Sequence, residues 1–209
     1  MIEAVIIILL AYFIGAIPSG YLIGRFHGID IRTVGSCNTG ATNVTRCISK
    51  KAGIFCFFCD FLKGAVPVVC AMTFSALPWL PLAAFAAAVA GHMFPVYLKF
   101  KGGKGIATAA GGAFAIAPLP LLAALLIWYV IFRISRYVSL ASIIAALMLP
   151  VGALILCLCF DPEKTHFLLR ARWATVIAFA LIGVLAVYRH RSNIVRLLNG
   201  TESRFEKKK

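Results

Sequence analysis

The residues with the clearest chemical potential form a basic, glycine-rich turn between two long apolar runs. The turn spans residues 100–105, reads FKGGKG, and leads directly into a helix-compatible run that begins at Ile106. Glycines let the backbone approach a ligand closely, and the N–H groups at the start of a helix attract anions. We therefore predict that Lys104, together with the N–H groups of Gly102 and Gly103, forms half of a phosphate pocket. An ordinary basic turn at a membrane surface is the alternative that these residues leave open.

A second polar cluster, rich in small residues, lies before the second apolar run. It spans residues 35–46 and reads GSCNTGATNVTR. Its small residues permit close backbone approach, its hydroxyls and amides can donate to phosphate oxygens, and Arg46 can hold a phosphate through two nitrogens. An amphipathic interfacial helix with a polar cap is the alternative. The density of small donors favours phosphate binding.

Three ionisable residues lie inside otherwise apolar sequence. Asp60 and Lys63 are three positions apart, one helical turn, and a charge in an apolar segment is costly unless it is paired. We predict an intrahelical ion pair that also packs the neighbouring loop, with a direct substrate role as the alternative. His92 ends the third apolar run, where it can act either as a general base or as a hydrogen-bonded structural residue.

Two further polar groups flank the last two apolar runs. Ser139 and Ser142 lie on the first turn of one expected helix, and a helix N-terminus favours anions. We predict a ligand contact from Ser142, although such hydroxyls also cap or pack helices. His190, Asn193 and Arg196 recur every three residues after the last run, so they share one helical face, which can face either a ligand or solvent.

Composition identifies the class of protein that must position these groups. The 209 residues are 62% hydrophobic and only 13% charged, with a mean hydropathy of +0.95. So little polar surface cannot cover a water-soluble globule. The net charge of +14 is distributed at the ends of apolar runs rather than along one stripe, which argues for membrane orientation and anionic ligands and against nucleic acid. We predict one polytopic membrane domain, residues 1–209, without a metal site.

The apolar runs give the expected membrane segments. A straight span needs about 20 residues. Most runs come close to that length, namely 2–23, 54–76, 79–98, 137–160 and, somewhat shorter, 173–188. The run 105–132 is too long for one straight helix and too short for two full spans, and it is interrupted by Pro118 and Pro120.

Loop charge decides how the interrupted run is interpreted. If it forms two short legs hinged at the prolines, every loop lysine and arginine lies on one face except Lys164, Arg170 and Arg172. A single crossing would divide the charges almost evenly, which the positive-inside rule disfavours. We therefore predict an all-α integral membrane protein with seven transmembrane segments, its N-terminus outside and its C-terminus cytoplasmic. All the polar clusters then converge on the cytoplasmic face.

The polar clusters, in this order, closely resemble those of the bacterial membrane acyl-phosphate:glycerol-3-phosphate acyltransferase family (PlsY-type). The resemblance extends along essentially the whole chain, and its glycine-rich blocks are highly specific. The matching blocks are residues 35–43, 60–64, 91–95, 102–108, 139–142 and 189–194. Cys37 departs from the pattern, since the family usually has glycine there. A positive φ at that position would strain a cysteine.

The resemblance implies transfer of a fatty acyl group from acyl phosphate to the sn-1 hydroxyl of glycerol 3-phosphate. The products would be 1-acyl-glycerol 3-phosphate (lysophosphatidic acid) and phosphate, in the first acylation of phospholipid biosynthesis, without coenzyme A or another cofactor. It also implies a multi-pass protein of the bacterial cytoplasmic (inner) membrane, with its active site facing the cytoplasm. Its partners would be acyl phosphate, glycerol 3-phosphate, membrane lipid and the enzyme that supplies acyl phosphate.

The resemblance also assigns the site. Phosphate binding would fall to Ser36, Thr42, Arg46, Gly102, Gly103, Lys104 and Ser142, with the charge supplied by Arg46 and Lys104. The catalytic group would comprise Ser36, Ser142, His190 and Asn193, the last two orienting the acceptor. Supporting positions would be Asn38, Asn43, Asp60, Lys63 and His92.

The expected mechanism is direct attack, because none of the four histidines begins a His-x-x-x-x-Asp motif. The donor's own phosphate would accept the proton while the cationic groups stabilise developing charge. A covalent acyl-serine at Ser36 or Ser142 is the competing mechanism. A transporter or binding protein for an organic phosphate is the rival function, but the sequence lacks the inverted repeat that such transporters show.

Overall fold

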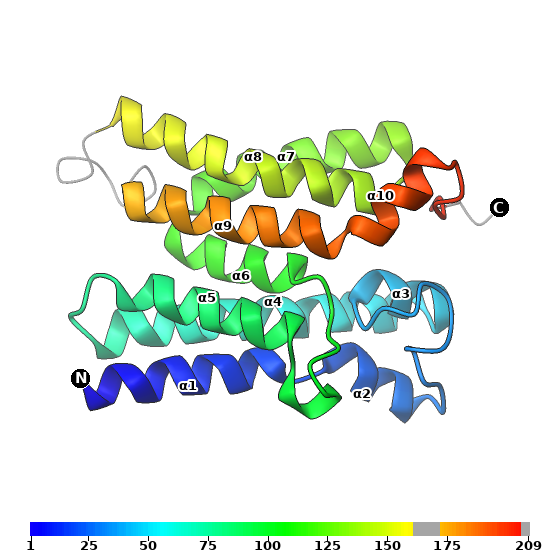
Figure 1. The fold of residues 1–209 in the computed structure, drawn as a ribbon, viewed down its shortest axis with the longest axis horizontal. Helices are drawn as coiled ribbons and strands as arrows, with labels where there is room; N and C mark the ends of the chain where they lie inside the picture. Colours follow the sequence, from blue (N-terminus) through cyan, green and yellow to red (C-terminus); the bar gives the residue numbers. More distant parts are fainter. Residues whose placement is uncertain (161–171, 206–209) are drawn as a thin grey trace. The chain divides into compact units, whose positions relative to one another are not determined.

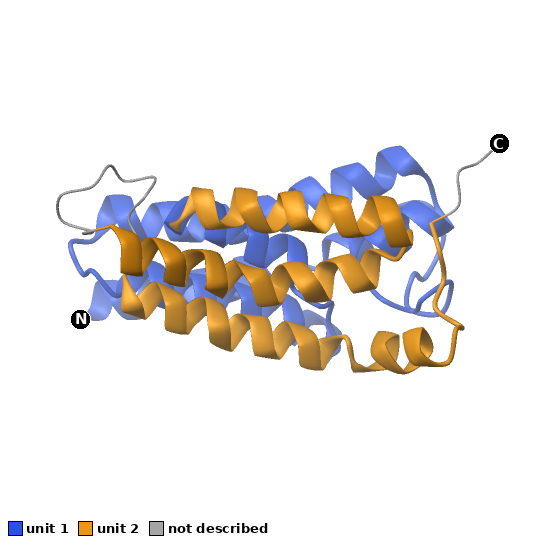
Figure 2. Ribbon diagram, turned by 90° about the horizontal axis from the view of Figure 1, so that it is seen from above, with its two compact units in different colours: residues 1–116 blue, residues 117–209 orange. Residues whose placement is uncertain are grey.

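The computed structural model describes residues 1–160 and 172–205, and every regular element in that part of the chain is helical. The helices divide into two units, Met1–Ile116 and Ala117–Lys209, shown in blue and orange in Figure 2. An all-helical structure follows from the apolar sequence, because a backbone inside a membrane must satisfy its own hydrogen bonds.

The first unit contains six α-helices and a short 3-10 helix (Figure 1). These elements are α1 (Ile2–Ala16), α2 (Ser19–Phe26), α3 (Ala41–Cys47), α4 (Lys50–Phe74), α5 (Leu80–Met93), η1 (Val96–Leu98) and α6 (Ile106–Ile116). Helix α1 packs against α5, and α4 packs against α3, α5 and α6. Pro18 separates α1 from α2, as expected for a residue that lacks a backbone N–H. Ser49 caps α4 by accepting the N–H of Ala52 at 3.1 Å.

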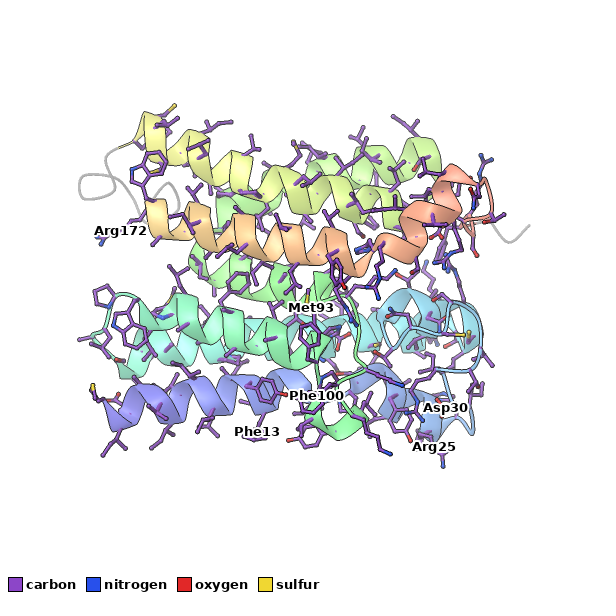
Figure 3. The ribbon with its side chains drawn as sticks, in the orientation of Figure 1. Phe13, Arg25, Asp30, Met93, Phe100 and Arg172 are labelled. Carbon is purple, nitrogen blue, oxygen red and sulfur yellow. The ribbon has the colours of Figure 1, made fainter. Side chains whose placement is uncertain are left out.

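Small residues hold the first unit together. A methyl group added at Gly15 would overlap the carbonyl of Ala88, where α1 crosses α5. A methyl group at Gly64 would likewise overlap the carbonyl of Thr108, where α4 crosses α6. Lipid tails are as apolar as a leucine side chain, so helices in a membrane gain stability from such close backbone packing. Many large apolar side chains face outward, as Phe13 does on α1 (Figure 3), although a few such as Phe85 are fully buried.

The polar end of the first unit is built by α2, α3 and their loops. Arg25 and Asp30 lie there together in Figure 3. Asp30 accepts two hydrogen bonds from the Arg32 side chain, at 2.9 and 2.7 Å. These bonds lower the pKa of Asp30 to about 2. The ion pair fixes the turn between α2 and the loop that precedes α3.

The second unit contains α7 (Pro118–Ser135), α8 (Val138–Cys159), α9 (Trp173–Arg189) and α10 (Arg191–Leu198). Helix α8 packs against both α7 and α9. Arg136 has a φ of 63° and allows the tight turn from α7 into α8. Helix α10 is bent by 56° from α9.

The predicted membrane character is confirmed, at a coarser level than the sequence suggested. Five helical segments in the described residues are long and apolar enough to cross a membrane, and α9 with α10 forms a sixth if the bent pair is one span. The interrupted run divides into α6 and α7 at Ala117, next to the predicted hinge. Helix α6, at 11 residues, is shorter than a straight span requires. The loop containing Lys164 and Arg170 lies outside the described residues.

Candidate functional site

The polar cluster of residues 35–46 is organised by the buried side chain of Asn43. Its amide nitrogen donates to the carbonyl oxygens of Ile31, Val34 and Asn38, at 3.0, 3.1 and 3.0 Å. Its amide oxygen accepts the N–H of Ser36 at 2.8 Å. One amide therefore holds the loop in place at four points, which fits the supporting role that the sequence predicted for Asn43.

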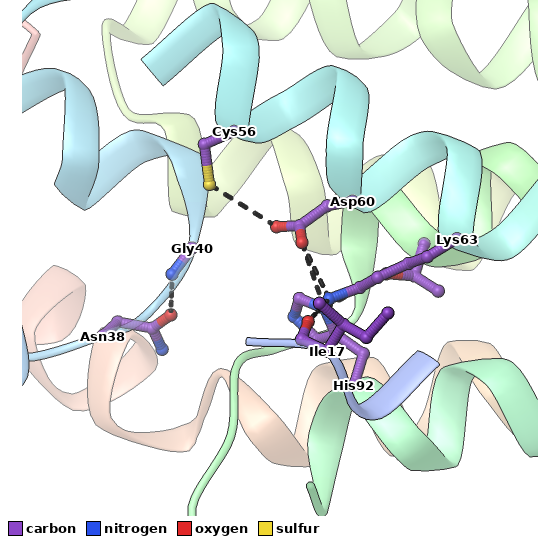
Figure 4. A network of polar contacts seen from close by, with 8 residues as sticks. Ile17, Asn38, Gly40, Cys56, Asp60, Lys63 and His92 are labelled. Carbon is purple, nitrogen blue, oxygen red and sulfur yellow. Dashed lines mark hydrogen bonds and ion pairs between the residues drawn. The ribbon is translucent and has the colours of Figure 1, made fainter. Parts of the chain in front are cut away.

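The loop that contains Ser36 adopts an unusual backbone conformation. Gly35 has a φ of 60° and Cys37 has a φ of 54°. The conformation that would strain Cys37 is therefore present, at the position where the family pattern usually has glycine. Asn38 accepts the N–H of Gly40 at 2.9 Å, an Asx turn that leads into α3 (Figure 4). Helix α3 then carries Thr42, half-buried, and Arg46, exposed.

The ion pair predicted within α4 is confirmed. Lys63 Nζ lies 2.8 Å from Asp60 Oδ1, with side chains only 6% and 2% exposed. Lys63 also donates to the carbonyl oxygen of Ile17 at 2.8 Å, where α1 ends before Pro18. Figure 4 shows both contacts, together with the Cys56 thiol 3.8 Å from Asp60 Oδ2. The pair thus joins α4 to the break between α1 and α2.

His92 is a buried, hydrogen-bonded residue next to this pair. Its Nδ1 lies 3.1 Å from the Thr108 hydroxyl on α6 and 3.8 Å from Asp60 Oδ1. The histidine therefore connects the end of α5 with α4 and with the start of α6. This geometry matches the structural interpretation of His92, and its role as a general base stays a prediction.

The glycine-rich turn uses two of its N–H groups internally. Gly103 donates to the carbonyl oxygen of His92 at 3.1 Å, and Gly102 donates to that of Met93 at 3.3 Å. A methyl group at Gly103 would overlap the His92 imidazole. The glycine pattern predicts that these two N–H groups bind phosphate, whereas in this structure they close the turn onto the end of α5. The sequence alone does not show which backbone N–H groups form hydrogen bonds within the protein.

The second unit contains a carboxylate cluster that the sequence analysis missed. Glu202 Oε1 accepts hydrogen bonds from Ser139 Oγ at 2.7 Å and from Asn193 Nδ2 at 2.6 Å. Its Oε2 accepts from Arg196 Nε at 2.7 Å. Burial of this carboxylate raises its pKa, but the three hydrogen bonds outweigh that effect and hold the pKa below its usual range. The available signal was an acid in a basic tail, in a chain with only seven acidic residues.

The other predicted residues of the second unit are also engaged in hydrogen bonds. His190 Nδ1 donates to the carbonyl oxygen of Ala186 at 2.8 Å, so a neutral imidazole carries its lone pair on Nε2. Ser142 Oγ accepts the indole N–H of Trp128 at 3.1 Å. Asn193 and Arg196 meet at Glu202, which confirms that they share a helical face, whereas His190 bonds back to α9.

The predicted site residues thus fall into three clusters in the part of the chain that the structure describes. The loop cluster contains Ser36, Asn38 and Asn43, continuing into α3 with Thr42 and Arg46. The ion-pair cluster of the same unit contains Asp60, Lys63 and His92 and closes onto Gly102 and Gly103, which precede Lys104. The cluster of the second unit contains Asn193 on α10, with Ser142 on α8 and His190 at the junction of α9 and α10. Among residues 1–160 and 172–205, no group of three metal-ligating side chains is placed to hold an ion.

Glycine-rich cationic loops at the ends of apolar helices define an integral membrane protein that handles anionic substrates. Residues 5–200 match the glycerol-3-phosphate acyltransferase family, and the chain belongs to that family. It is 44% identical to the glycerol-3-phosphate acyltransferase of Aquifex aeolicus over 206 residues, covering 97% of this chain and 100% of the relative. The protein is therefore a membrane acyltransferase of lipid synthesis and not a transporter.

Two crystal structures are similar to the whole chain. Both are of PlsY, an integral membrane glycerol 3-phosphate acyltransferase, in its glycerol 3-phosphate form and its lysophosphatidic acid form. Their TM-scores are 0.87 and 0.82, at 41% identity, over 98% of this chain and 96% of theirs. A match of that length and closeness extends the similarity from single motifs to the complete fold.

Proposed function

We propose that this enzyme transfers a fatty acyl group from acyl phosphate to the sn-1 hydroxyl of glycerol 3-phosphate. The products are lysophosphatidic acid and inorganic phosphate, and the reaction is the first acylation of phospholipid biosynthesis. The observation that carries the proposal is the match, over 98% of the chain, to structures of a relative in its glycerol 3-phosphate and lysophosphatidic acid forms. Acyl phosphate is already activated, so the reaction requires neither coenzyme A nor a resident cofactor.

The proposed chemistry is a direct attack. The acceptor hydroxyl oxygen forms a bond to the acyl carbonyl carbon, the bond from that carbon to the phosphate oxygen breaks, and phosphate leaves. The hydroxyl proton passes to an oxygen of the departing phosphate. The enzyme brings two anionic substrates together and stabilises the charge that develops during transfer.

In the first unit we assign the phosphate charge to Arg46 and Lys104. Ser36 and Thr42 contribute hydroxyls, supported by the loop that Asn43 and Asn38 hold in place. Gly102 and Gly103 act by permitting close approach beside Lys104 rather than through their own N–H groups, which close the turn. Asp60, Lys63 and His92 support this unit.

In the second unit we assign phosphate contact to Ser142 and acceptor orientation to His190 and Asn193. Asn193 is held through its amide nitrogen by Glu202. His190 is held through Nδ1 by the carbonyl of Ala186, which orients its ring and leaves Nε2 as the basic nitrogen. Both side chains are therefore set by the protein before substrate binds.

The proposed topology has seven membrane segments, an external N-terminus and a cytoplasmic C-terminus, in the bacterial cytoplasmic membrane. It is supported by the separation of α6 from α7 and by the distribution of loop arginines and lysines. The active site then faces the cytoplasm, where the enzyme that supplies acyl phosphate would deliver its product. A green fluorescent protein fused to the C-terminus should fluoresce in cells, and a dark but membrane-inserted fusion would contradict this orientation.

The first experiment is phosphate release from purified protein given acyl phosphate, with and without glycerol 3-phosphate. We expect release that depends on the acceptor and yields lysophosphatidic acid. Lys104→Ala should lower kcat/KM by at least about 100-fold, because it removes a charge-assisted contact to phosphate. Lys51→Ala, an exposed lysine at the start of α4, is the matched control and should behave as wild type.

The competing covalent mechanism has its own test. Protein incubated with acyl phosphate alone should keep its unmodified mass if the attack is direct. An acyl adduct on Ser36 or Ser142, formed and consumed as fast as turnover, would replace the direct mechanism.

A further inference from the structure

Four buried polar residues join the two ends of the loop that carries the glycine-rich turn. They are Asp60 and Lys63 on α4, His92 near the end of α5 and Thr108 near the start of α6, and each is at most 7% exposed. His92 precedes the turn and Thr108 follows it, so their 3.1 Å hydrogen bond closes the base of the loop. We call this group the clasp.

We infer that the clasp is a positioning device for the glycine-rich turn and thereby sets the affinity of the enzyme for a phosphate-bearing substrate. The inference rests on the proposed role of Lys104 in phosphate binding and extends it to residues that need not touch substrate. Its elements lie in the first unit alone.

The position of the turn depends directly on His92. The main-chain carbonyls of His92 and Met93 accept the N–H groups of Gly103 and Gly102. The imidazole itself occupies the space beside Gly103, because a methyl group there would overlap Nε2. A rotation of the imidazole would therefore press on the turn one residue before Lys104. Only a glycine at residue 103 permits this contact.

The orientation of the imidazole depends in turn on the rest of the clasp. Nδ1 lies between the Thr108 hydroxyl at 3.1 Å and Asp60 Oδ1 at 3.8 Å. Asp60 is held by Lys63 at 2.8 Å, and Lys63 is held by the carbonyl of Ile17 at 2.8 Å. Figure 4 shows Asp60, Lys63, His92 and Ile17 converging on one point. Three of these links are polar contacts of 2.8 to 3.1 Å, and the longer approach of His92 to Asp60 lies in the same buried environment, where polar contacts strongly favour one geometry.

The clasp also borders the polar cluster of residues 35–46. A small cavity in the first unit is lined by Asp60, Lys63 and His92 together with Ser19 and Thr39. Thr39 lies in the segment between Ser36 and α3 that the sequence predicted to bind phosphate. The clasp is thus adjacent to both phosphate-binding segments of this unit, which is where a positioning device must lie.

The test separates positioning from stability and from chemistry. Thr108→Val removes the hydroxyl that holds the imidazole and keeps the side-chain shape. We expect KM for at least one of the two substrates, acyl phosphate or glycerol 3-phosphate, to rise about tenfold while kcat changes by less than about threefold. Thr73→Val is the matched control, because the Thr73 hydroxyl bonds only the Val69 carbonyl in its own exposed turn. It should leave both constants unchanged.

Two outcomes would overturn the inference. The first is a collapse of kcat with both KM values unchanged, which would place His92 among the reacting groups. The second is a lowered unfolding temperature with wild-type kcat and KM, which would make the clasp purely structural. Lys104→Ala is measured alongside. A wild-type result for Lys104→Ala would defeat the proposed phosphate role of the turn, whereas an impaired Lys104→Ala with a wild-type Thr108→Val would defeat only the clasp.

A second measurement applies if Thr108→Val does not fold. Gly103→Ala should raise KM because the new methyl group meets the imidazole. Adding His92→Ala removes the ring and opens the space that the methyl group needs. We expect the double variant to have a KM no higher than that of Gly103→Ala, a departure from additivity that marks direct coupling. If the fold-increase in KM of the double variant equals the product of the increases from the two single substitutions, the ring and the turn act independently.

Discussion

The two units of this acyltransferase stabilise their buried carboxylates in different ways. Asp60 lies within a membrane-spanning helix, and its cation, Lys63, comes from the next turn of the same helix. Glu202 lies beyond α10 and receives its hydrogen bonds from Ser139 on α8 and from Asn193 and Arg196 on α10. A charge among apolar helices has no water to compensate it, so a residue of opposite charge must lie within contact distance. A carboxylate in a chain end can instead fasten one segment to several others.

The largest expected effect comes from breaking the first arrangement. Lys63→Met should destabilise the protein by about 3–5 kcal/mol, because it removes the cation partner of a buried carboxylate. The unfolding temperature in detergent measures this loss. Asp60→Asn/Lys63→Met removes both charges and should recover most of it. A double variant as unstable as Lys63→Met would show that the buried charge is not the cause.

A smaller and more local effect is expected from Glu202→Gln. The substitution weakens the bonds to Ser139 and Arg196, at a cost of about 1–3 kcal/mol for imperfectly satisfied buried donors. Hydrogen exchange should speed up in α10 and in residues 199–205 while α4 and α5 keep their protection. Uniform loss of protection across both units would contradict the view of Glu202 as a local fastening. Glu3→Gln, a change at an exposed acid near the N-terminus, is the control.

Acid should loosen the Glu202 cluster in a defined direction. The pKa of Glu202 is lower in the folded protein than its usual value, so its contribution to stability is complete above the usual glutamate pKa. The contribution is lost as pH falls through the depressed folded pKa. Hydrogen exchange of α10, corrected for intrinsic rates, should therefore rise at acidic pH in wild type. The same pH dependence in Glu202→Gln would show that another group is responsible.

The smallest expected effect concerns Cys37, in the loop of the first unit. A cysteine at a φ of 54° is strained, and glycine relieves that strain at some cost in chain entropy. We expect Cys37→Gly to stabilise the protein by about 0.5–1 kcal/mol. Cys37→Ala retains the strained backbone and should leave stability unchanged, which makes it the matched control. Equal gains from both substitutions would attribute the effect to the thiol.

Much of the fold could be predicted because its causes are local. The length of most apolar runs is enough to indicate a helix able to cross a membrane, and Pro118 marks the separation of α6 from α7. The ion pair of Asp60 and Lys63 follows from their spacing along one helix. The resemblance also placed Asn43 among the supporting positions, and its side chain holds the loop in the structure, while its role in the reaction stays a prediction.

The sequence falls short where a contact joins distant parts of the chain. The N–H groups of Gly102 and Gly103 bond the carbonyls of Met93 and His92, and these contacts are not evident from the sequence around the turn. Whether the two glycines also contact phosphate stays a prediction. Thr108 was not singled out, because nothing near it in sequence shows that it meets His92. Glu202 was missed for the same reason. Its partners Asn193 and Ser139 lie on separate helices, and Ser139 is 63 residues away in the sequence.

The membrane class, most of the helices and the family could all be inferred from the amino-acid sequence, which also supplied the residues that we propose for phosphate binding. These properties depend on composition, on runs of adjacent residues and on short motifs, all of which are complete within one stretch of chain. Only the tertiary structure decided which polar groups meet: Thr108 with His92, Lys63 with Ile17, and Glu202 with Ser139. Those pairings depend on how helices pack through their small residues, and packing is a property of surfaces that no single stretch of sequence contains.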